Sequence, residues 1–481
     1  MTSHLTSLFR HWAHAEATIQ PLQAHASPRK IYRLTDGEGK KSAIGVIHQN
    51  KDENRAFIHF SKFFKSKGLS VPEIYAEDLS HDSYLQEDLG DETLLDRVKS
   101  ARTFTPKLES IYANCLTQLV AFQFIAGPDL NYSLCTPVES HRYDALLWDL
   151  NYFKESFLKR SSVSFEAALL TQDLETFARH LSNIYDPARD GAVFMFRDFQ
   201  ARNIMMRGDT PCFIDYQSGR KGAPYLDVAM LLGQVSANIP EDARQRLLQH
   251  YYVTAVPFLR ITKEEFDQRF HVYSLALLLH HLGTYGRFGI GAQIPYFMSS
   301  LQKAVAKLPK LLNDKPLPVK IPELSRVLTA VAALAGKDAK DLLSPALLRI
   351  TVKSFSYKKG VPIFPLEEKI GSRSGGGFLF DCRCLQNPGR EIEYKVKTGR
   401  DPEVIEFLEN IPTVLSYREH VLALTKIAVE NYLERGFTDL VIGFGCTGGQ
   451  HRSVYFSEFL ARHLYMNYPV QVQLSHRELG L

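Results

Sequence analysis

Hydrophobic and polar positions follow two different periods in the N-terminal part of the chain. Residues 41–49 (KSAIGVIHQ) and 83–89 (SYLQEDL) show the short apolar runs of β-strands, and residues 54–68 between them have the three- to four-residue spacing of an amphipathic helix. Longer helical patterns dominate further along. The pattern therefore predicts a small strand-rich lobe, about 1–90, followed by a larger helical lobe, about 91–305.

One strand-and-turn segment, 192–217, interrupts the helical lobe. A strand-rich lobe followed by a helical lobe is the outline of an α+β, protein-kinase-like fold. The stretch 307–324 is rich in Pro and Lys and has no period, which indicates a boundary. We therefore predict a kinase-like domain over 1–305, a linker with a short helix over 306–347, and a smaller α/β domain over 348–481.

The second domain contains a glycine-rich turn between a buried strand, 439–445, and an amphipathic helix, 454–468. Such a turn presents backbone N–H groups at a helix N-terminus, a geometry that suits an anion and above all a phosphate. The residues expected at this anion site are Thr447, Gly448, Gly449, Gln450, His451, Arg452 and Ser453.

The same turn also contains a C-x5-R pattern, from Cys446 to Arg452. In cysteine phosphatases this pattern binds phosphate beside a thiolate of lowered pKa. Cys446 follows an apolar strand directly, and no acidic residue is identified as a general acid. This favours a buried, structural thiol, with a C-terminal phosphatase as an alternative function.

Three polar residues in the segment 192–217 have the spacing of a phosphoryl-transfer centre. Asp198 and Asn203 are separated by four residues, and Asp215 follows on a short apolar strand. Phosphoryl transfer needs a carboxylate that orients the attacking hydroxyl and accepts its proton, and oxygen ligands that hold Mg²⁺ on the nucleotide phosphates. We therefore expect Asp198 as the catalytic base, Asn203 and Asp215 as metal ligands, and ATP and Mg²⁺ as cofactors.

Composition and charge are those of an ordinary globular protein, with 45% hydrophobic and 23% charged residues. The net charge of +4 is too small to indicate a nucleic-acid binder by itself. The six cysteines have no framework spacing, which predicts reduced thiols in a cytoplasmic protein. The N-terminus has no continuous apolar core and no run approaches membrane length, so neither a signal peptide nor a membrane span is expected.

Residues 1–305 resemble the aminoglycoside phosphotransferase superfamily, small-molecule relatives of the protein kinases. RDFQARNIM stands where that superfamily carries its catalytic loop, and IDYQ stands at its second metal position. Within GAPYLDVAMLL, Asp227 corresponds to the residue that braces the loop. The likeness extends to kinases of N-acetylmuramate and N-acetylglucosamine, which implies a small sugar as substrate.

The same resemblance implies a nucleotide site in the small lobe. ASPRKIYRL (26–34) matches the phosphate-covering turn, with Ala26 in place of the usual glycine, and LQEDLG (85–90) resembles the adenine-binding hinge. The residues expected to contact ATP are Ser27, Arg29, Gln86, Glu87 and Leu89. Glu53 corresponds to the acidic residue that such kinases commonly carry on the helix after the strand 41–49. The strand 41–49 lacks the central lysine that many kinases use for the α- and β-phosphates, and Lys41 lies only at its start.

Residues from about 348 to the end resemble the C-terminal domain of the RNase adapter protein RapZ. Five motifs carry the resemblance in order: SFSYKKGVP, FDCRCLQNPGR, KTGRDPEVIEFL, GCTGGQHRSVYFSEFLARHL and LSHREL. In that family the domain binds glucosamine-6-phosphate, which implies a sugar-phosphate effector at the glycine-rich turn. Nearby loops would contribute Arg383, Asn387, Arg390 and Thr398. The chain has no Walker-type P-loop, which RapZ proteins carry in their first domain.

Some RapZ-type domains also bind a small regulatory RNA. Residues 349–400 hold eleven Lys or Arg against five acids, and SFSYKKG interleaves aromatic and basic residues, as RNA binding requires and as a solvated loop also shows. A non-catalytic adapter that binds RNA or a protein partner is therefore the main alternative to a regulated sugar kinase. The sequence is also compatible with a homo-oligomer.

Overall fold

The computed structural model describes residues 3–22, 29–191, 193–362 and 374–481. The chain forms two compact units, and each unit is assembled from three separate segments. The segments of the first unit are Met1–Trp148, Leu174–Leu278 and Asp314–Lys320. Those of the second are Asp149–Asp173, Leu279–Asn313 and Ile321–Leu481. The C-terminal domain therefore shares its unit with two segments of the helical region that precedes it.

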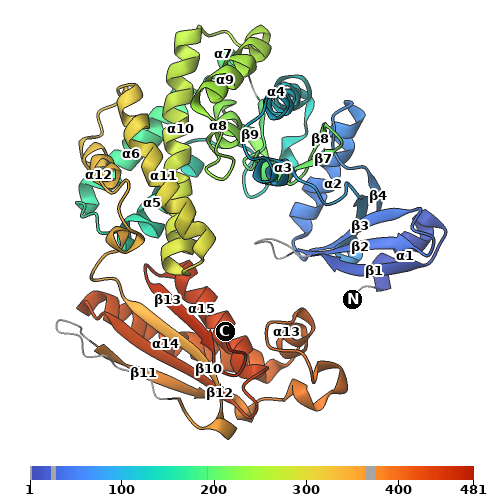
Figure 1. Cartoon of the computed structure of the whole chain (residues 1–481), viewed down its shortest axis with the longest axis vertical. Coiled ribbons are helices and arrows are strands. Elements are labelled where there is room, and N and C mark those ends of the chain that lie inside the picture. Colours follow the sequence, from blue (N-terminus) through green and yellow to red (C-terminus); the bar gives the residue numbers. More distant parts are fainter. Residues whose placement is uncertain (1–2, 23–28, 192, 363–373) are drawn as a thin grey trace. The chain divides into compact units, whose positions relative to one another are not determined.

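The first unit begins with an antiparallel sheet in the strand order β1-β2-β3-β5-β4 (Figure 1). Its strands are β1 (Ala17–Leu22), β2 (Lys30–Asp36), β3 (Ser42–Ile47), β4 (Ile74–Asp78) and β5 (Ser83–Glu87). Helix α1 (Ser3–Ala13) packs its buried Leu5 and Phe9 against this sheet, because its apolar positions recur on one face. Helix α2 (Lys51–Ser66) follows β3, and Asn50 caps it.

Helices make up most of the remainder of the first unit. They are α3 (Leu94–Ser100), α4 (Pro106–Val120), α7 (Pro187–Asp190), α8 (Tyr225–Gly233) and α9 (Glu241–Ala255), while α6 (Ala167–Ile184) and α10 (Lys263–Tyr285) cross the unit boundaries. Two strand pairs carry the predicted catalytic motif. These are β6 (Val193–Met195) with β9 (Arg220–Gly222), and β7 (Ile204–Arg207) with β8 (Thr210–Phe213).

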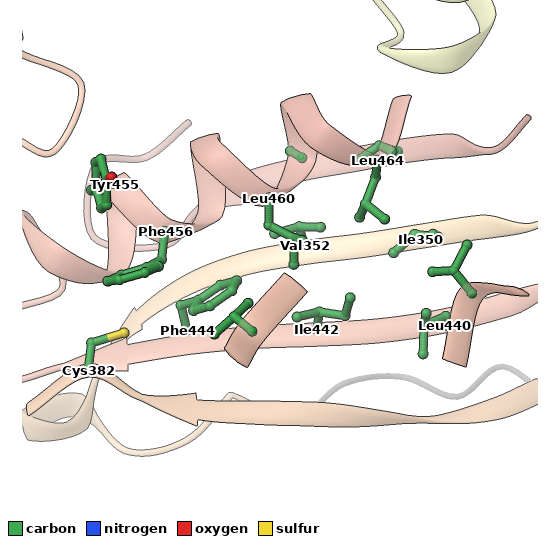
Figure 2. Packing of buried hydrophobic residues seen from close by; sticks show 14 of the residues in the cluster. Ile350, Val352, Cys382, Leu440, Ile442, Phe444, Tyr455, Phe456, Leu460 and Leu464 are labelled. Atoms are coloured by element: carbon green, nitrogen blue, oxygen red, sulfur yellow. The ribbon is translucent and has the colours of Figure 1, made fainter. Parts of the chain in front are cut away.

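The C-terminal domain is built on a parallel sheet in the order β11-β12-β10-β13 (Figure 1). The strands are β10 (Arg349–Ser356), β11 (Ser374–Asp381), β12 (Asp439–Cys446) and β13 (Gln471–His476), and the helices are α13 (Pro402–Glu409), α14 (Pro412–Arg435) and α15 (Arg452–Asn467). Strands covered on both faces are apolar almost throughout, as β12 is. Figure 2 shows Phe444 of β12 near Phe456 of α15, and their ring centroids are 5.9 Å apart.

Helical segments that precede the C-terminal domain complete the second unit. They include parts of α5 (Tyr143–Ser156) and α11 (Pro295–Asp314), the π-helical turn Gly286–Gly291, and α12 (Pro322–Ala332). Arg160 joins them to the C-terminal domain, although its side chain is only 2% exposed. Its guanidinium donates to five backbone carbonyl oxygens, those of Glu155, Ser156, Tyr465, Tyr468 and Val470.

The predicted fold class, a strand-rich lobe and a helical lobe followed by a smaller α/β domain, is confirmed, and the structure adds that the sheet of the smaller domain is parallel. Helix α11 continues to Asp314 across Pro309, so it overlaps the first residues of the predicted linker, 306–347. The buried apolar face of this helix, which includes Leu301 and Leu308, offsets the hydrogen bond that a proline removes. Within the described residues, no helix combines the length and the apolar character that crossing a membrane requires.

Candidate functional site

The predicted catalytic loop lies between β6 and β7 of the first unit. The side-chain amide of Asn203 donates to the backbone oxygen and to Oδ2 of Asp198, both at 3.0 Å, and to Oδ2 of Asp215 at 3.2 Å. Asp198 also accepts from Nε2 of Gln200. The three residues that the spacing singled out are thus brought together in one hydrogen-bonded cluster.

The electrostatics of this cluster suit a proton acceptor beside a cation site. Burial raises the pKa of the Asp198 carboxyl above its ordinary range, and the negative charge of Asp215 raises it further. The carboxyl of Asp215 is 37% exposed. Because the NH₂ group of Asn203 makes the contacts above, its oxygen is the atom available to a cation. A carboxylate and an amide oxygen are ligands that fit Mg²⁺.

One residue of the cluster and one residue beside it have a left-handed backbone. Arg197 has φ 72° and Asp215 has φ 67°. For residues other than glycine this conformation costs on the order of 1–2 kcal/mol, and it persists where the surrounding structure fixes it. Asp227 does this for Arg197, because its buried carboxylate accepts the N–H of Phe196 at 2.9 Å and of Arg197 at 3.0 Å.

Replacement of Asp227 by Asn tests this brace. We expect the Asp227→Asn variant to lose about 1–3 kcal/mol of stability, because an amide NH₂ would face a buried backbone N–H. Urea denaturation followed by tryptophan fluorescence measures the loss, since both tryptophans, Trp12 and Trp148, lie in the first unit. The control is Asp209→Asn, which removes the charge of an exposed carboxylate paired with Arg97 and Lys107 and should cost no more than about 1 kcal/mol. Equal stabilities of the two variants would contradict the role of Asp227.

Arg29 directly precedes β2 and lies between two carboxylates. Its Nη2 is 2.8 Å from Oε2 of Glu53 on α2, and its Nη1 is 3.4 Å from Oδ1 of Asp215. The guanidinium is largely buried, with 11% of the side chain exposed. Ser27, expected beside Arg29 at the phosphates, lies outside the described residues.

The predicted adenine hinge lies at the end of β5. Leu89 is buried, and Oε1 of Gln86 is buried without a hydrogen-bond partner among the described residues. Glu87 directs its carboxylate to Arg207 at 2.5 Å and Lys65 at 3.5 Å. Its side chain is therefore held on the protein, which leaves any adenine contact of this residue to its backbone.

The predicted anion site in the second unit is a turn at the carboxyl end of β12. Gly449 has φ 72°, and a Cβ there would lie 2.3 Å from Cγ of Glu478 and 3.0 Å from the backbone nitrogen of Ser356. Only glycine fits this position. The N–H of Gly449 donates to Sγ of Cys446 at 3.1 Å, and Oγ of Ser453 lies 3.2 Å from the same sulfur. The buried sulfur of Cys446 thus holds the turn through contacts with Gly449 and Ser453.

The residues of this turn divide into an exposed and a buried group. Thr447, Gly448 and Gln450 are exposed, whereas His451, Arg452 and Ser453 are buried. Nε2 of His451 is 2.8 Å from the backbone oxygen of Tyr394. The exposed group is therefore the part of the turn that a ligand in solvent reaches, whereas the side chains of the first turn of α15 are buried.

Arg452, expected at the phosphate, points into the protein instead. Its Nη1 donates to the carbonyl oxygens of Cys382, Arg383 and Leu385 at 3.2, 3.3 and 2.7 Å. It therefore ties α15 to the turn that follows β11. This use of the guanidinium also weakens the phosphatase alternative, in which the arginine of a C-x5-R loop holds the phosphate itself.

The sequence interpretation missed two residues that support the turn, Ser356 and Glu478. Oγ of Ser356 donates to the backbone oxygen of Thr447 at 2.7 Å. The carboxylate of Glu478 pairs with Lys359 at 2.6 Å and with Arg477 at 2.7 Å. Both lie in motifs already singled out, SFSYKKGVP and LSHREL, but their contacts depend on strands that are far apart in sequence.

Of the loop residues expected near the sugar, two have well-defined partners. Arg383 pairs with Asp381 at 2.6 Å and lies over the ring of Tyr357, 3.8 Å from its centroid. The hydroxyl of Thr398 donates to Asp401 at 2.8 Å. A Cβ at Gly389 would lie 3.1 Å from Cε1 of His451, which places this loop beside the turn.

Comparisons with protein families identify both parts of the chain. The model of the phosphotransferase enzyme family matches residues 18–261, and the model of the RapZ C-terminal domain matches residues 348–480. The first match contains the whole cluster around Asp198, and the second contains the whole turn around Gly449. The two resemblances inferred from the motifs are therefore confirmed.

Curated relatives are similar to this chain over part of their length. A nucleotide-binding protein of Thermosipho melanesiensis is 32% identical over 187 residues, which are 38% of this chain and 60% of that protein. One of Thiobacillus denitrificans is 40% identical over 147 residues, 29% of this chain and 47% of that protein. The chain thus spans about half the length of the curated relatives it matches.

Solved structures with a similar fold are small-molecule kinases. Spectinomycin phosphotransferase, solved with ADP and spectinomycin, is 12% identical with a TM-score of 0.42, over 68% of this chain and 97% of that one. Choline kinase from Cryptosporidium parvum is 13% identical with a TM-score of 0.46, over 68% of this chain and 100% of that one. At these identities and TM-scores the likeness carries no conclusion about this chain.

Proposed function

Because the chain belongs to the phosphotransferase enzyme family through residues 18–261, we propose that it is an ATP- and Mg²⁺-dependent kinase of an amino sugar or a cell-wall sugar. The observation that carries this proposal is the cluster in which Asn203 contacts both Asp198 and Asp215. The sugar class rests on the likeness of RDFQARNIM and GAPYLDVAMLL to the motifs of cell-wall sugar kinases.

In this proposal Asp198 accepts a hydrogen bond from the acceptor hydroxyl and takes its proton as the hydroxyl oxygen bonds to the γ-phosphorus of ATP and the bond from that phosphorus to the leaving ADP breaks. Burial raises the pKa of this carboxyl, which makes it a stronger base than an exposed aspartate. Asn203 orients Asp198 through its amide and, with Asp215, would hold Mg²⁺ through oxygen atoms. Bound Mg²⁺ supplies positive charge that offsets the charge of the phosphates.

We also propose that the C-terminal domain binds a sugar phosphate, such as glucosamine-6-phosphate, and regulates the kinase. Its match to the RapZ C-terminal domain and the position of the turn support this. Ligands of parallel α/β sheets bind at the carboxyl ends of the strands, and a helix N-terminus favours a phosphate there. The turn after β12 combines both features.

A coupled assay of ADP release tests the kinase. It compares N-acetylglucosamine, N-acetylmuramate, glucosamine and galactosamine as acceptors, each with and without glucosamine-6-phosphate. Turnover with one of these sugars is the expected result, and a response to glucosamine-6-phosphate supports regulation. ATP binding without turnover on any sugar would contradict the kinase and favour the adapter alternative.

Replacement of Gly449 by Ala tests the sugar-phosphate site. We expect the Gly449→Ala variant to bind glucosamine-6-phosphate at least about tenfold more weakly, because its Cβ collides with Glu478 and displaces the turn. Isothermal titration calorimetry measures the affinity. The control is Gly436→Ala, which also stands at positive φ, 68°, but in open space at the end of α14. Equal affinities in both variants would place the ligand elsewhere.

A further inference from the structure

Strand β3 of this kinase fold has no lysine. In protein kinases a lysine on the third strand contacts the nucleotide phosphates and pairs with a glutamate of the next helix. Here β3 reads SAIGVI. Lys41, just before it, donates its Nζ to the backbone oxygen of Ala13 at 2.7 Å, on the side of helix α1. Lys41 therefore does not take the lysine's place.

The glutamate of the following helix is nevertheless present and held in position. Glu53 lies in the first turn of α2, where its N–H donates to Oδ1 of the capping Asn50 at 3.2 Å. Nδ2 of Asn50 returns a hydrogen bond to Oε1 of Glu53 at 3.1 Å. One carboxylate oxygen is thus fixed by the cap, and Oε2 faces Arg29 and His48.

The strand register brings Arg29 to this glutamate. Lys30 of β2 pairs with Ile47 of β3, so the chain at Arg29 lies beside the end of β3. From there the guanidinium reaches Glu53 at 2.8 Å and Asp215 at 3.4 Å. It therefore spans the helix carboxylate and the carboxylate expected to hold the metal.

We propose that Arg29 does the work of the absent lysine, holding the α- and β-phosphates of the nucleotide while Glu53 positions it. This inference rests on the proposed function as a kinase. A guanidinium offers five donors in a planar fork that matches phosphate oxygens, so one arginine can keep Glu53 and still bind a phosphate. The positive charge that binds the phosphates would thus lie at Arg29, just before β2, and not on β3.

The neighbouring His48 is not expected to bind the phosphates. Its Nε2 is 3.3 Å from Oε2 of Glu53. Burial and the positive charge of Arg29 lower the pKa of His48, so it is neutral at physiological pH and adds no charge for a phosphate. Arg29 is consequently the residue whose loss should affect polyphosphate binding.

Calorimetric titration of the full chain with Mg²⁺–ADP and with adenosine tests the proposal. The variants are Arg29→Met, Arg29→Lys, Glu53→Gln and the double variant Arg29→Met with Glu53→Gln. The matched control is Arg55→Met, which removes an exposed charge from the same helix, two residues from Glu53. Thermal unfolding of each variant confirms that it is folded.

We expect Arg29→Met to weaken Mg²⁺–ADP binding about ten- to a hundredfold and to leave adenosine binding unchanged. Glu53→Gln should weaken ADP binding less, and the double variant should match Arg29→Met alone, because Glu53 acts through Arg29. Arg29→Lys should retain part of the affinity, and Arg55→Met all of it.

The outcomes separate this inference from the proposed function. If the unmodified chain binds ADP and Arg29→Met binds it within twofold, the inference is wrong and the kinase stands. If Glu53→Gln and Arg29→Met have additive effects, Glu53 does not act through Arg29. If the unmodified chain binds no adenine nucleotide, the proposed function falls, and the inference falls with it.

Discussion

The Asp198→Asn variant is expected to transfer phosphate about 10²–10⁴-fold more slowly than the unmodified chain. Asparagine fills the same space and can still contact Asn203, but it cannot accept the proton of the attacking hydroxyl. Nucleotide affinity should stay within about threefold, because in the proposed mechanism Asn203 and Asp215, which Asp198 lies beside, hold the metal. The coupled ADP-release assay and calorimetric titration measure the two quantities.

The pH dependence of activity in the unmodified chain provides a second test of Asp198 as the proton acceptor. Burial and the charge of Asp215 raise the pKa of Asp198, and a general base works only when deprotonated. Activity should therefore fall, as pH is lowered, at a higher pH than an exposed aspartate would give. An Asp198→Asn variant with undiminished turnover would show that another residue accepts the proton.

Replacement of the buried Arg160 should have the largest effect on stability. We expect the Arg160→Met variant to destabilise the second unit by about 3–5 kcal/mol, because five backbone carbonyl oxygens lose a charged donor. Burial lowers the pKa of Arg160 to about 10, so the side chain is still charged at neutral pH. Amide hydrogen exchange over residues 149–160 and 456–470 measures the loss.

A matched control lies one residue away. Lys159 is exposed and pairs with Glu155 at 2.5 Å, so Lys159→Met should cost no more than about 1 kcal/mol. The first unit offers an internal reference, since amide exchange in its sheet, β1 to β5, should be unchanged in both variants. Similar exchange rates in Arg160→Met and Lys159→Met would refute the anchoring role of Arg160.

The kinase cluster could be predicted from sequence because local structure assembles it. Asp198, Asn203 and Asp215 lie on either side of one hairpin, β7–β8, so their spacing nearly determines their geometry. The pairing of Arg29 with Glu53 depends on the register of β2 with β3, which no local pattern reveals.

The C-terminal turn shows the same limit. Its strand, glycines and helix followed from hydrophobic period and turn chemistry. The direction of Arg452 did not, because it is set by carbonyl groups of residues 382–385 that belong to a different loop. The continuation of α11 across Pro309 did not follow from the local composition either, because it depends on the apolar face that keeps this helix packed.

The interleaving of the two units along the chain bears on how such a fusion arises by recombination. A crossover in the linker alone would bring in strands β10 to β13 without Arg160. The guanidinium of this residue binds the backbone carbonyl groups at the C-terminal end of α15 and just after it. Arg160 and the turn at residues 465–470 must have matched from the outset or changed together afterwards. Exchanging C-terminal domains between relatives should therefore succeed only when the segment 149–173 travels with them.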